Sequence, residues 1–163
     1  MKYRRLRKDE LEELKTEFIR FLASHTITGQ DWSRLKTEEP QKANELVDIF
    51  SDIVFDNILK KIEYLEFKSP KDIKVFNCLA DKIIMMGIVI EGKTDIDFTK
   101  DTEPGSLKEQ LHRSGAKVKL YRAEKKYTKE RELELFGMME QGCLIAKEQL
   151  FKTLESLTKA QKN

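Results

Sequence analysis

The residues IEYLEFKSPKDIKVFNCLADKIIMMGIVIE, from Ile62 to Glu91, decide the fold of this chain. Two turn-like breaks, Ser69–Asp72 and Ala80–Asp81, divide this stretch into three runs rich in β-branched and aromatic side chains, which is typical of an antiparallel meander. The third run, Ile83 to Ile90, is apolar except for Gly87. We therefore expect it to lie inside the sheet, with a strand on each side and cover on both faces.

Apolar residues recur at helical spacing on both sides of this meander. They predict helices over residues 10–24, 29–36, 40–60, 107–113 and 128–159. Alternation over residues 116–122 predicts a fourth strand that pairs with the third. The fold class is therefore α+β: an antiparallel sheet of about four strands, the meander 64–91 plus strand 116–122, covered by N-terminal helices and a long C-terminal helix.

Length and composition indicate one soluble domain over residues 1–163, with 37% charged and 39% hydrophobic residues. Within it we expect a basic arm at 1–8, a solvated acidic loop at 92–105 and a frayed tail at 160–163. No apolar segment follows the basic arm, as it would in a secretory signal, and no run is long enough to span a membrane. Cys78 and Cys143 fit free, buried thiols in a reducing cytoplasm.

The opening MKYRRL and the segment FSDIVFDNILKKIEYLEFKSPKDIKVF, from Phe50 to Phe76, support a family assignment. With these segments the chain resembles a family of small, functionally uncharacterised cytosolic bacterial proteins, over most of its length. The resemblance implies a cytoplasmic location. It implies no activity, cofactor or site residue.

No catalytic, cofactor-binding or metal-binding motif is visible, so we expect no cofactor and no metal. The two histidines, His25 and His112, have no neighbouring nucleophile or second ligand in the sequence. Asp95 and Asp97 suggest calcium, but the EF-hand spacing then places Lys100 where Gly is required and Ser106 where Glu is required. We therefore favour a non-enzymatic protein, while an enzyme whose site is assembled from distant positions stays open.

One hypothesis for function is nucleic-acid binding, RNA in particular, by a basic segment over residues 113–126. Its basic side chains are interleaved with Tyr121 and with Tyr127 just after the segment, and such a strand can follow a phosphate backbone and stack on bases. The candidate binding residues are Arg113, Lys117, Lys119, Tyr121, Arg122, Lys125 and Lys126. No established RNA-binding motif accompanies them.

We favour a second hypothesis, a cytosolic binding module for an unknown protein partner or for a second copy of the chain. Met138 and Ile145 fall off the apolar stripe of the expected C-terminal helix, two turns apart, and are the candidate partner contacts. The basic N-terminal arm could dock on an acidic partner surface. This hypothesis predicts a dependence on apolar residues, whereas nucleic-acid binding predicts a steep dependence on salt.

Overall fold

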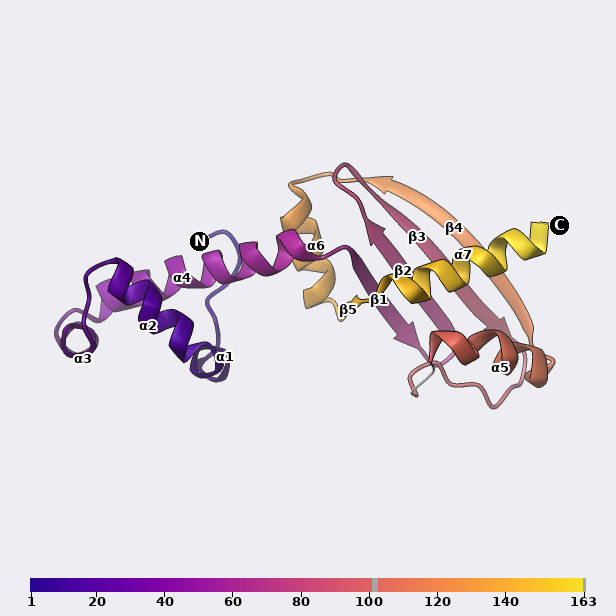
Figure 1. The fold of residues 1–163 in the computed structure, drawn as a ribbon, viewed down its shortest axis with the longest axis horizontal. Helices are drawn as coiled ribbons and strands as arrows, with labels where there is room; N and C mark the ends of the chain where they lie inside the picture. Colours follow the sequence, from indigo (N-terminus) through magenta and orange to yellow (C-terminus); the bar gives the residue numbers. More distant parts are fainter. Residues whose placement is uncertain (101–102, 163) are drawn as a thin grey trace. The chain divides into compact units, whose positions relative to one another are not determined.

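The computed structural model describes residues 1–100 and 103–162, whose helices and strands are shown in Figure 1. Asp101 of the expected acidic loop and Asn163 of the expected tail lie outside them. The chain divides into two compact units, residues 1–60 and 61–163; the single domain stays a prediction. In order, the elements are α1 (Lys8–Glu13), α2 (Lys15–Ser24), α3 (Gly29–Glu38), α4 (Pro40–Lys61), β1 (Tyr64–Ser69), β2 (Asp72–Cys78), β3 (Lys82–Glu91), η1 (Pro104–Ser106), α5 (Leu107–Ser114), β4 (Lys117–Lys126), α6 (Arg131–Glu140), β5 (Leu144–Ala146) and α7 (Glu148–Lys162).

The first unit is helical and buries its own apolar cluster, which includes Phe18, Leu22, Val47 and Phe50. The Trp32 ring packs edge-on against Phe18, with 5.1 Å between ring centroids. One prediction for this unit was wrong, because the expected helix 10–24 is divided at Leu14 into α1 and α2. The bend places side chains from both short helices against the same cluster.

The second unit contains an antiparallel sheet with the strand order β4-β3-β2-β1-β5. The meander is confirmed: β1, β2 and β3 pair in sequence and turn at the two predicted breaks. The fourth strand also pairs with β3 as predicted, although it is longer than expected and runs to Lys126. β3 therefore has a hydrogen-bonded neighbour on each side.

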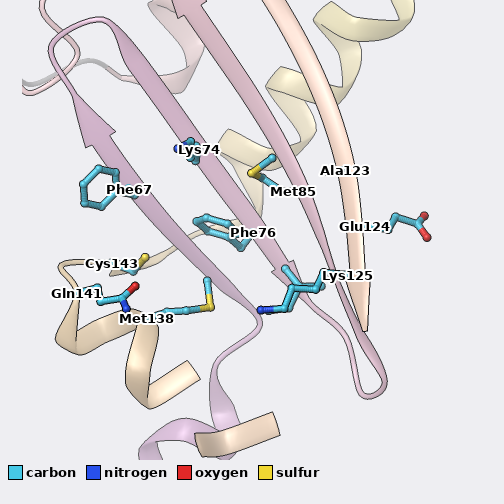
Figure 2. A pocket seen from close by; sticks show the side chains of 11 residues that line it. Phe67, Lys74, Phe76, Met85, Ala123, Glu124, Lys125, Met138, Gln141 and Cys143 are labelled. Carbon is cyan, nitrogen blue, oxygen red and sulfur yellow. The ribbon is translucent and has the colours of Figure 1, made fainter. Parts of the chain in front are cut away.

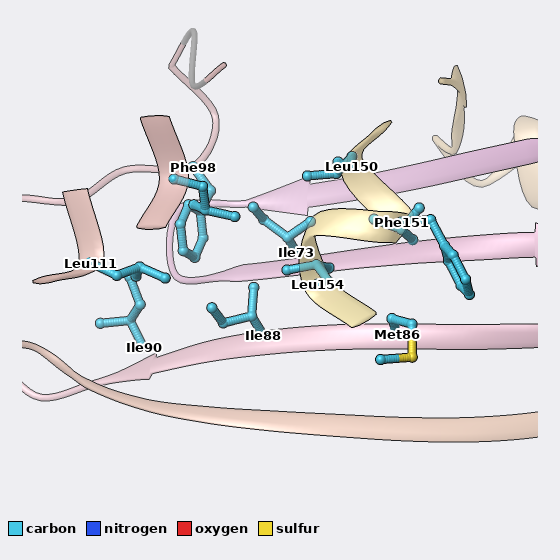
Figure 3. Packing of buried hydrophobic residues seen from close by; sticks show 11 residues of the cluster. Ile73, Met86, Ile88, Ile90, Phe98, Leu111, Leu150, Phe151 and Leu154 are labelled. Atoms are coloured by element: carbon cyan, nitrogen blue, oxygen red, sulfur yellow. The ribbon is translucent and has the colours of Figure 1, made fainter. Parts of the chain in front are cut away.

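One face of the sheet, called here the helix face, carries the buried side chains Ile73, Val75, Met86, Ile88 and Ile90. Figure 3 shows how residues of α5 and α7 pack onto it, together with Phe98 from the loop after β3. The loop at 92–105 is therefore not simply solvated, because Phe98 is fully buried. The Lys71 ammonium also ties the loop down, donating to the backbone oxygens of Thr94 and Ile96 at 2.9 and 2.6 Å.

The long C-terminal helix expected at 128–159 was wrong, since the chain forms α6, then β5, then α7. Gly142 adopts a φ of 113°, and the Cys143 N–H donates to the Met138 carbonyl at 3.0 Å, so α6 ends in a glycine-dependent cap. The freed segment Leu144–Ala146 pairs with β1 and becomes a fifth strand. α7 then continues through residues 160–162, which were expected to be frayed.

The opposite face of the sheet, called here the pocket face, is less covered than the sequence predicted. Its side chains include Phe67, Lys74, Phe76 and Met85, which alternate with those of the helix face. Met85 is only half-buried, so full cover on both faces of β3 was wrong. At Gly87 this face is covered by a side chain, the ring of Tyr121, and not by a helix.

α6 lies against one end of the sheet and is fixed there by Arg131 (Figure 1). The Arg131 guanidinium donates hydrogen bonds to the backbone oxygens of Ile62, Cys78 and Leu79. The Tyr127 hydroxyl donates to the same Leu79 oxygen at 2.8 Å. These bonds hold α6 beside the start of β1 and the end of β2, at the edge of the pocket face.

Candidate functional site

A hollow of about 520 Å³ lies on the pocket face beside α6, and Figure 2 shows its lining side chains. Its lining is mainly apolar and comes from β1, β2, β3, β4 and α6. The apolar members include Phe67, Phe76, Met85, Ala123 and Met138. Binding pockets for small ligands commonly have this size and this apolar character.

The register of the sheet explains why these side chains meet. Phe67 pairs with Lys74 in one row, and Phe76, Met85 and Ala123 pair in the next, so side chains from all four strands project to the same face. Ala123 contributes only a methyl group, which leaves space above the β4 side. The turn after α6 closes the other side, where Gly142 lies close to the Phe67 ring.

Two lysines, Lys74 and Lys125, line the pocket and differ in their ion pairs. Lys125 of β4 pairs with Glu134 at 3.4 Å. The Glu134 carboxylate is buried and also accepts hydrogen bonds from Thr128 and Lys129 at the start of α6. Lys74 is half-buried, and no carboxylate of a described residue lies within ion-pair distance of it.

The two thiols near this face are poor nucleophiles. Burial raises the pKa of Cys78 to about 11, and burial also raises the pKa of Cys143, although the nearby Lys74 charge acts in the opposite direction. Both groups are therefore thiols at neutral pH. Among residues 1–100 and 103–162, no group of three or more His, Cys, Asp or Glu side chains is placed to hold a metal ion.

The structure divides the seven candidate nucleic-acid-binding residues between different surfaces. Lys117, Lys119, Tyr121 and Lys125 lie on the pocket face, whereas Arg122 and Lys126 project to the helix-face side of β4 and Arg113 belongs to α5. Four of the six basic side chains have carboxylate partners within 4.0 Å. The pairs are Arg113–Glu109, Lys117–Glu91, Arg122–Glu124 and Lys125–Glu134.

Tyr121 is held against the sheet. Its hydroxyl donates to Asp72 at 2.9 Å, and its ring occupies the space above Gly87. Burial and the hydrogen bond to Asp72 both raise the pKa of Tyr121 well above its ordinary value. One face of the ring is therefore used in packing.

The two candidate partner contacts lie in different elements. Met138 of α6 lines the pocket, while Ile145 is the central residue of β5 and is 55% exposed. Ile145 pairs with Leu65, so its side chain projects to the pocket face. The continuous helix on which they were predicted to lie two turns apart is absent, so that reason for choosing them was wrong.

Phe67, Lys74, Phe76 and Met85 were missed as site residues. Phe67 projects to the same face as Leu65, two residues earlier on β1, but Leu65 is fully buried. Phe67 is 40% exposed. The alternation of Lys74 with buried Ile73 and Val75 was a local signal for a side chain on the opposite face.

The basic N-terminal arm is bound within its own unit. Its basic side chains and backbone face Asp48, Asp52 and Asp56, which are spaced four residues apart along α4. Asp52 accepts from the Lys2 and Tyr3 backbone N–H groups at 2.7 and 3.0 Å. Arg5 binds Asp48 through two nitrogens, and Lys2 pairs with Asp56. Much of the charge expected to attract a partner is therefore neutralised internally.

Comparison with known proteins identifies one family match. A family model described as "Family of unknown function (DUF6495)" matches residues 1–159. No curated protein and no solved structure matches the chain. Within the described part of the chain, no helix has the length and apolar character needed to cross a membrane.

Proposed function

Because this chain belongs to DUF6495, a family of unknown function, we propose a function from its own residues: it is a non-enzymatic module that binds a partner protein. The binding site is the pocket on the pocket face, and a side chain of the partner fills it. Two free buried thiols, Cys78 and Cys143, support a reducing compartment such as the bacterial cytoplasm.

The observation that carries this proposal is the exposed apolar lining of the pocket. Phe67 remains 40% exposed, and Met85 and Met138 line the same hollow. Phenylalanine and methionine are enriched where proteins contact one another, and methionine side chains adapt to different partners. Exposed Ile145 lies on the same face and extends the apolar surface toward β5.

Site-specific photo-crosslinking in the native host tests the proposal. Benzoylphenylalanine replaces Phe67 in one variant and Met138 in a second; the control variant carries it at Ile53, an exposed apolar residue of α4. We expect one protein species to crosslink at both pocket positions and not at Ile53, and Phe76→Glu to abolish it. Identical patterns at all three positions, or no product at the pocket positions, would contradict the proposal. A crosslink to a second copy would identify self-association.

A second candidate function is nucleic-acid binding, favoured by one specific observation. Lys117, Lys119 and Tyr121 project to the same face as Phe67 and Phe76. A sheet face with lysines and aromatic side chains can bind a single strand by charge and stacking.

Anisotropy titrations with mixed RNA and DNA oligonucleotides at low salt test this candidate. Lys117→Glu combined with Lys119→Glu should weaken binding strongly, and the affinity should fall as salt rises. Arg113→Glu combined with Lys126→Glu is the matched control, because these residues lie away from the pocket face. If Lys117→Glu combined with Lys119→Glu leaves the affinity unchanged, or if the wild-type protein does not bind, this candidate function is excluded.

A further inference from the structure

We infer, on the basis of the proposed function, that the partner segment entering the pocket is acidic as well as apolar, and that one of its carboxylates pairs with Lys74. The partner is thus a polypeptide segment that combines apolar anchors with Asp or Glu. The inference rests on the position of Lys74 and on the state of the charges around it.

Lys74 lies among the apolar side chains of the pocket face. It projects from β2, with Phe67 opposite it on β1 and Gly87 opposite it on β3, where the Tyr121 ring fills the space. Figure 2 shows Lys74 and Phe67 at the end of the pocket away from α6. Lys74 and Cys143 both line the hollow. The ammonium group therefore belongs to the pocket.

The acidic groups near the pocket already have partners of their own. Asp72 accepts the Tyr121 hydroxyl, and Glu134 is bound to Lys125 and to the start of α6. Glu124 pairs with Arg122 at 2.6 Å and with Lys82 at 3.2 Å, and Figure 2 shows it turned away from the other lining side chains. Lys74 is left with no counter-charge among the described residues.

Docking an apolar segment would change the environment of Lys74. The segment would exclude water from a half-buried ammonium group, and a buried charge without a partner is strongly destabilising. A carboxylate on the incoming segment removes this cost and adds a charge-assisted hydrogen bond. A neutral or basic segment offers no such compensation, so the pocket discriminates in favour of an acidic partner.

The lining favours a polypeptide over a nucleic acid. A phosphate backbone is bound by several unpaired cations along its path. Lys125 is already paired, so Lys74 is the lysine of the pocket lining without a carboxylate partner among the described residues. Phe76, Met85 and Met138 around it suit apolar side chains.

Two synthetic peptides test the inference. Both have ten residues, and every second residue is apolar, either Phe or Leu. The remaining positions are Glu in one peptide and Lys in the other. We expect the wild-type protein to bind the Glu peptide at least about tenfold more tightly, which corresponds to about 1.4 kcal/mol. Amide chemical-shift changes should map to β1, β2 and α6. Lys74→Glu should reverse the preference, so that the Lys peptide binds more tightly.

The controls separate this inference from the proposed function. Lys42→Glu, an exposed change on α4, should alter neither affinity, and Met138→Gln, which makes the apolar lining polar without adding a charge, should weaken both peptides. Equal binding of both peptides, no binding of either, or a preference that survives Lys74→Glu overturns the acidic-partner inference. Displacement of the Glu peptide by an oligouridine, dependent on Lys74, overturns it in favour of nucleic acid. Photo-crosslinking at Phe67 and Met138 tests the proposed function separately, because it uses the partner in the native host and not these peptides.

Discussion

The aromatic ring of Tyr121 lies over Gly87 of the neighbouring strand, in the space that a side chain at position 87 would occupy. The two residues are directly opposite each other in the β3–β4 ladder. A Cβ atom on Gly87 would lie 2.1 to 2.5 Å from three atoms of the Tyr121 side chain. The tyrosine hydroxyl continues across to Asp72 of β2, so one side chain from β4 spans three strands.

We predict that Gly87→Ala destabilises the protein. The added methyl group forces the Tyr121 ring to move and weakens its hydrogen bond to Asp72, at a cost of about 1 to 3 kcal/mol in the free energy of unfolding. Chemical denaturation measures this cost. A double-mutant cycle with Tyr121→Ala should be non-additive, because removal of the ring makes room for the methyl group. Additive effects would contradict the packing relationship.

Gly137→Ala is the matched control, and it should stabilise the protein. Gly137 lies inside α6, and a Cβ atom there meets nothing within 4 Å. Alanine is favoured over glycine in a helix interior by about 0.8 to 1 kcal/mol. A loss of stability in this variant would mean that the surroundings of α6 differ from those described.

We predict that Asp52→Ala loosens the N-terminal arm. The substitution removes the acceptor for two backbone N–H groups, from Lys2 and Tyr3, and should lower the free energy of unfolding of the first unit by about 1 to 3 kcal/mol. Trp32 is the only tryptophan and packs in this unit, so its fluorescence follows the transition. Asp81→Ala, in the exposed turn after β2, should leave stability within about 0.5 kcal/mol.

The same arm predicts a pH dependence. Hydrogen bonds from Arg5 and Tyr3 lower the pKa values of Asp48 and Asp56 respectively, so these carboxylates bind protons less readily in the folded chain. Their stabilisation is complete above the ordinary Asp pKa of about 3.9 and is lost as the pH falls through the lowered values. Denaturation followed by Trp32 at pH 7 and pH 3 measures this loss, which Asp48→Asn should reduce. An equal pH dependence in that variant would contradict the assignment.

Tyr3 of the same arm adds a pH dependence of stability in the opposite direction, a loss as the pH rises. Burial and the hydrogen bond to Asp56 raise the pKa of Tyr3 to about 12. The contribution is therefore complete below the ordinary tyrosine value of about 10 and is lost as the pH rises through about 12. Tyr3→Phe should remove this part of the alkaline loss.

We predict that Arg131→Met weakens the attachment of α6. Its guanidinium is largely buried and donates to three backbone carbonyls, so the variant leaves these acceptors without that partner and should lose about 2 to 4 kcal/mol. Arg131→Lys should not restore stability, because one ammonium cannot reproduce the planar fork. Arg113→Met is the control, since that side chain is 81% exposed. Thermal unfolding of the three variants distinguishes them.

We predict that both cysteines resist modification in the folded protein. Cys78 is 5% exposed and Cys143 is 8% exposed, and burial raises the pKa of each thiol. Iodoacetamide at pH 8 should therefore modify the native protein far more slowly than the same protein in denaturant. Rapid labelling of either cysteine under native conditions would show that its thiol is accessible.

Local sequence patterns located most of the secondary structure. The predicted helix 29–36 begins after Thr28, whose spacing from Asp31 is that of a capping box, and the structure contains both hydrogen bonds of this box, Asp31 N–H to Thr28 at 3.1 Å and Thr28 N–H to Asp31 at 3.0 Å. The turn at Ser69–Asp72 and the apolar run of β3 were equally clear. These features depend on neighbours in the chain, which the sequence displays directly.

The C-terminal segment shows where local patterns are insufficient. Apolar residues continue at helical spacing from Leu133 to Leu157, and the same spacing fits two helices separated by a short strand. Gly142 was the local sign of a break. Gly142 alone does not indicate a strand after the break, because Leu144–Ala146 becomes a strand only by pairing with β1, which is distant in the sequence.

The sequence by itself determined the α+β class, the meander and the pairing of β4 with β3, because these follow from periodicity, turn residues and short-range connection. Only the tertiary structure decided which side chains share a surface. Phe67, Lys74, Met85 and Met138 meet because strand register and the position of α6 bring four separate segments together. Likewise, Asp52 holds the N-terminal arm across a separation of about fifty residues, and such contacts leave no local signal.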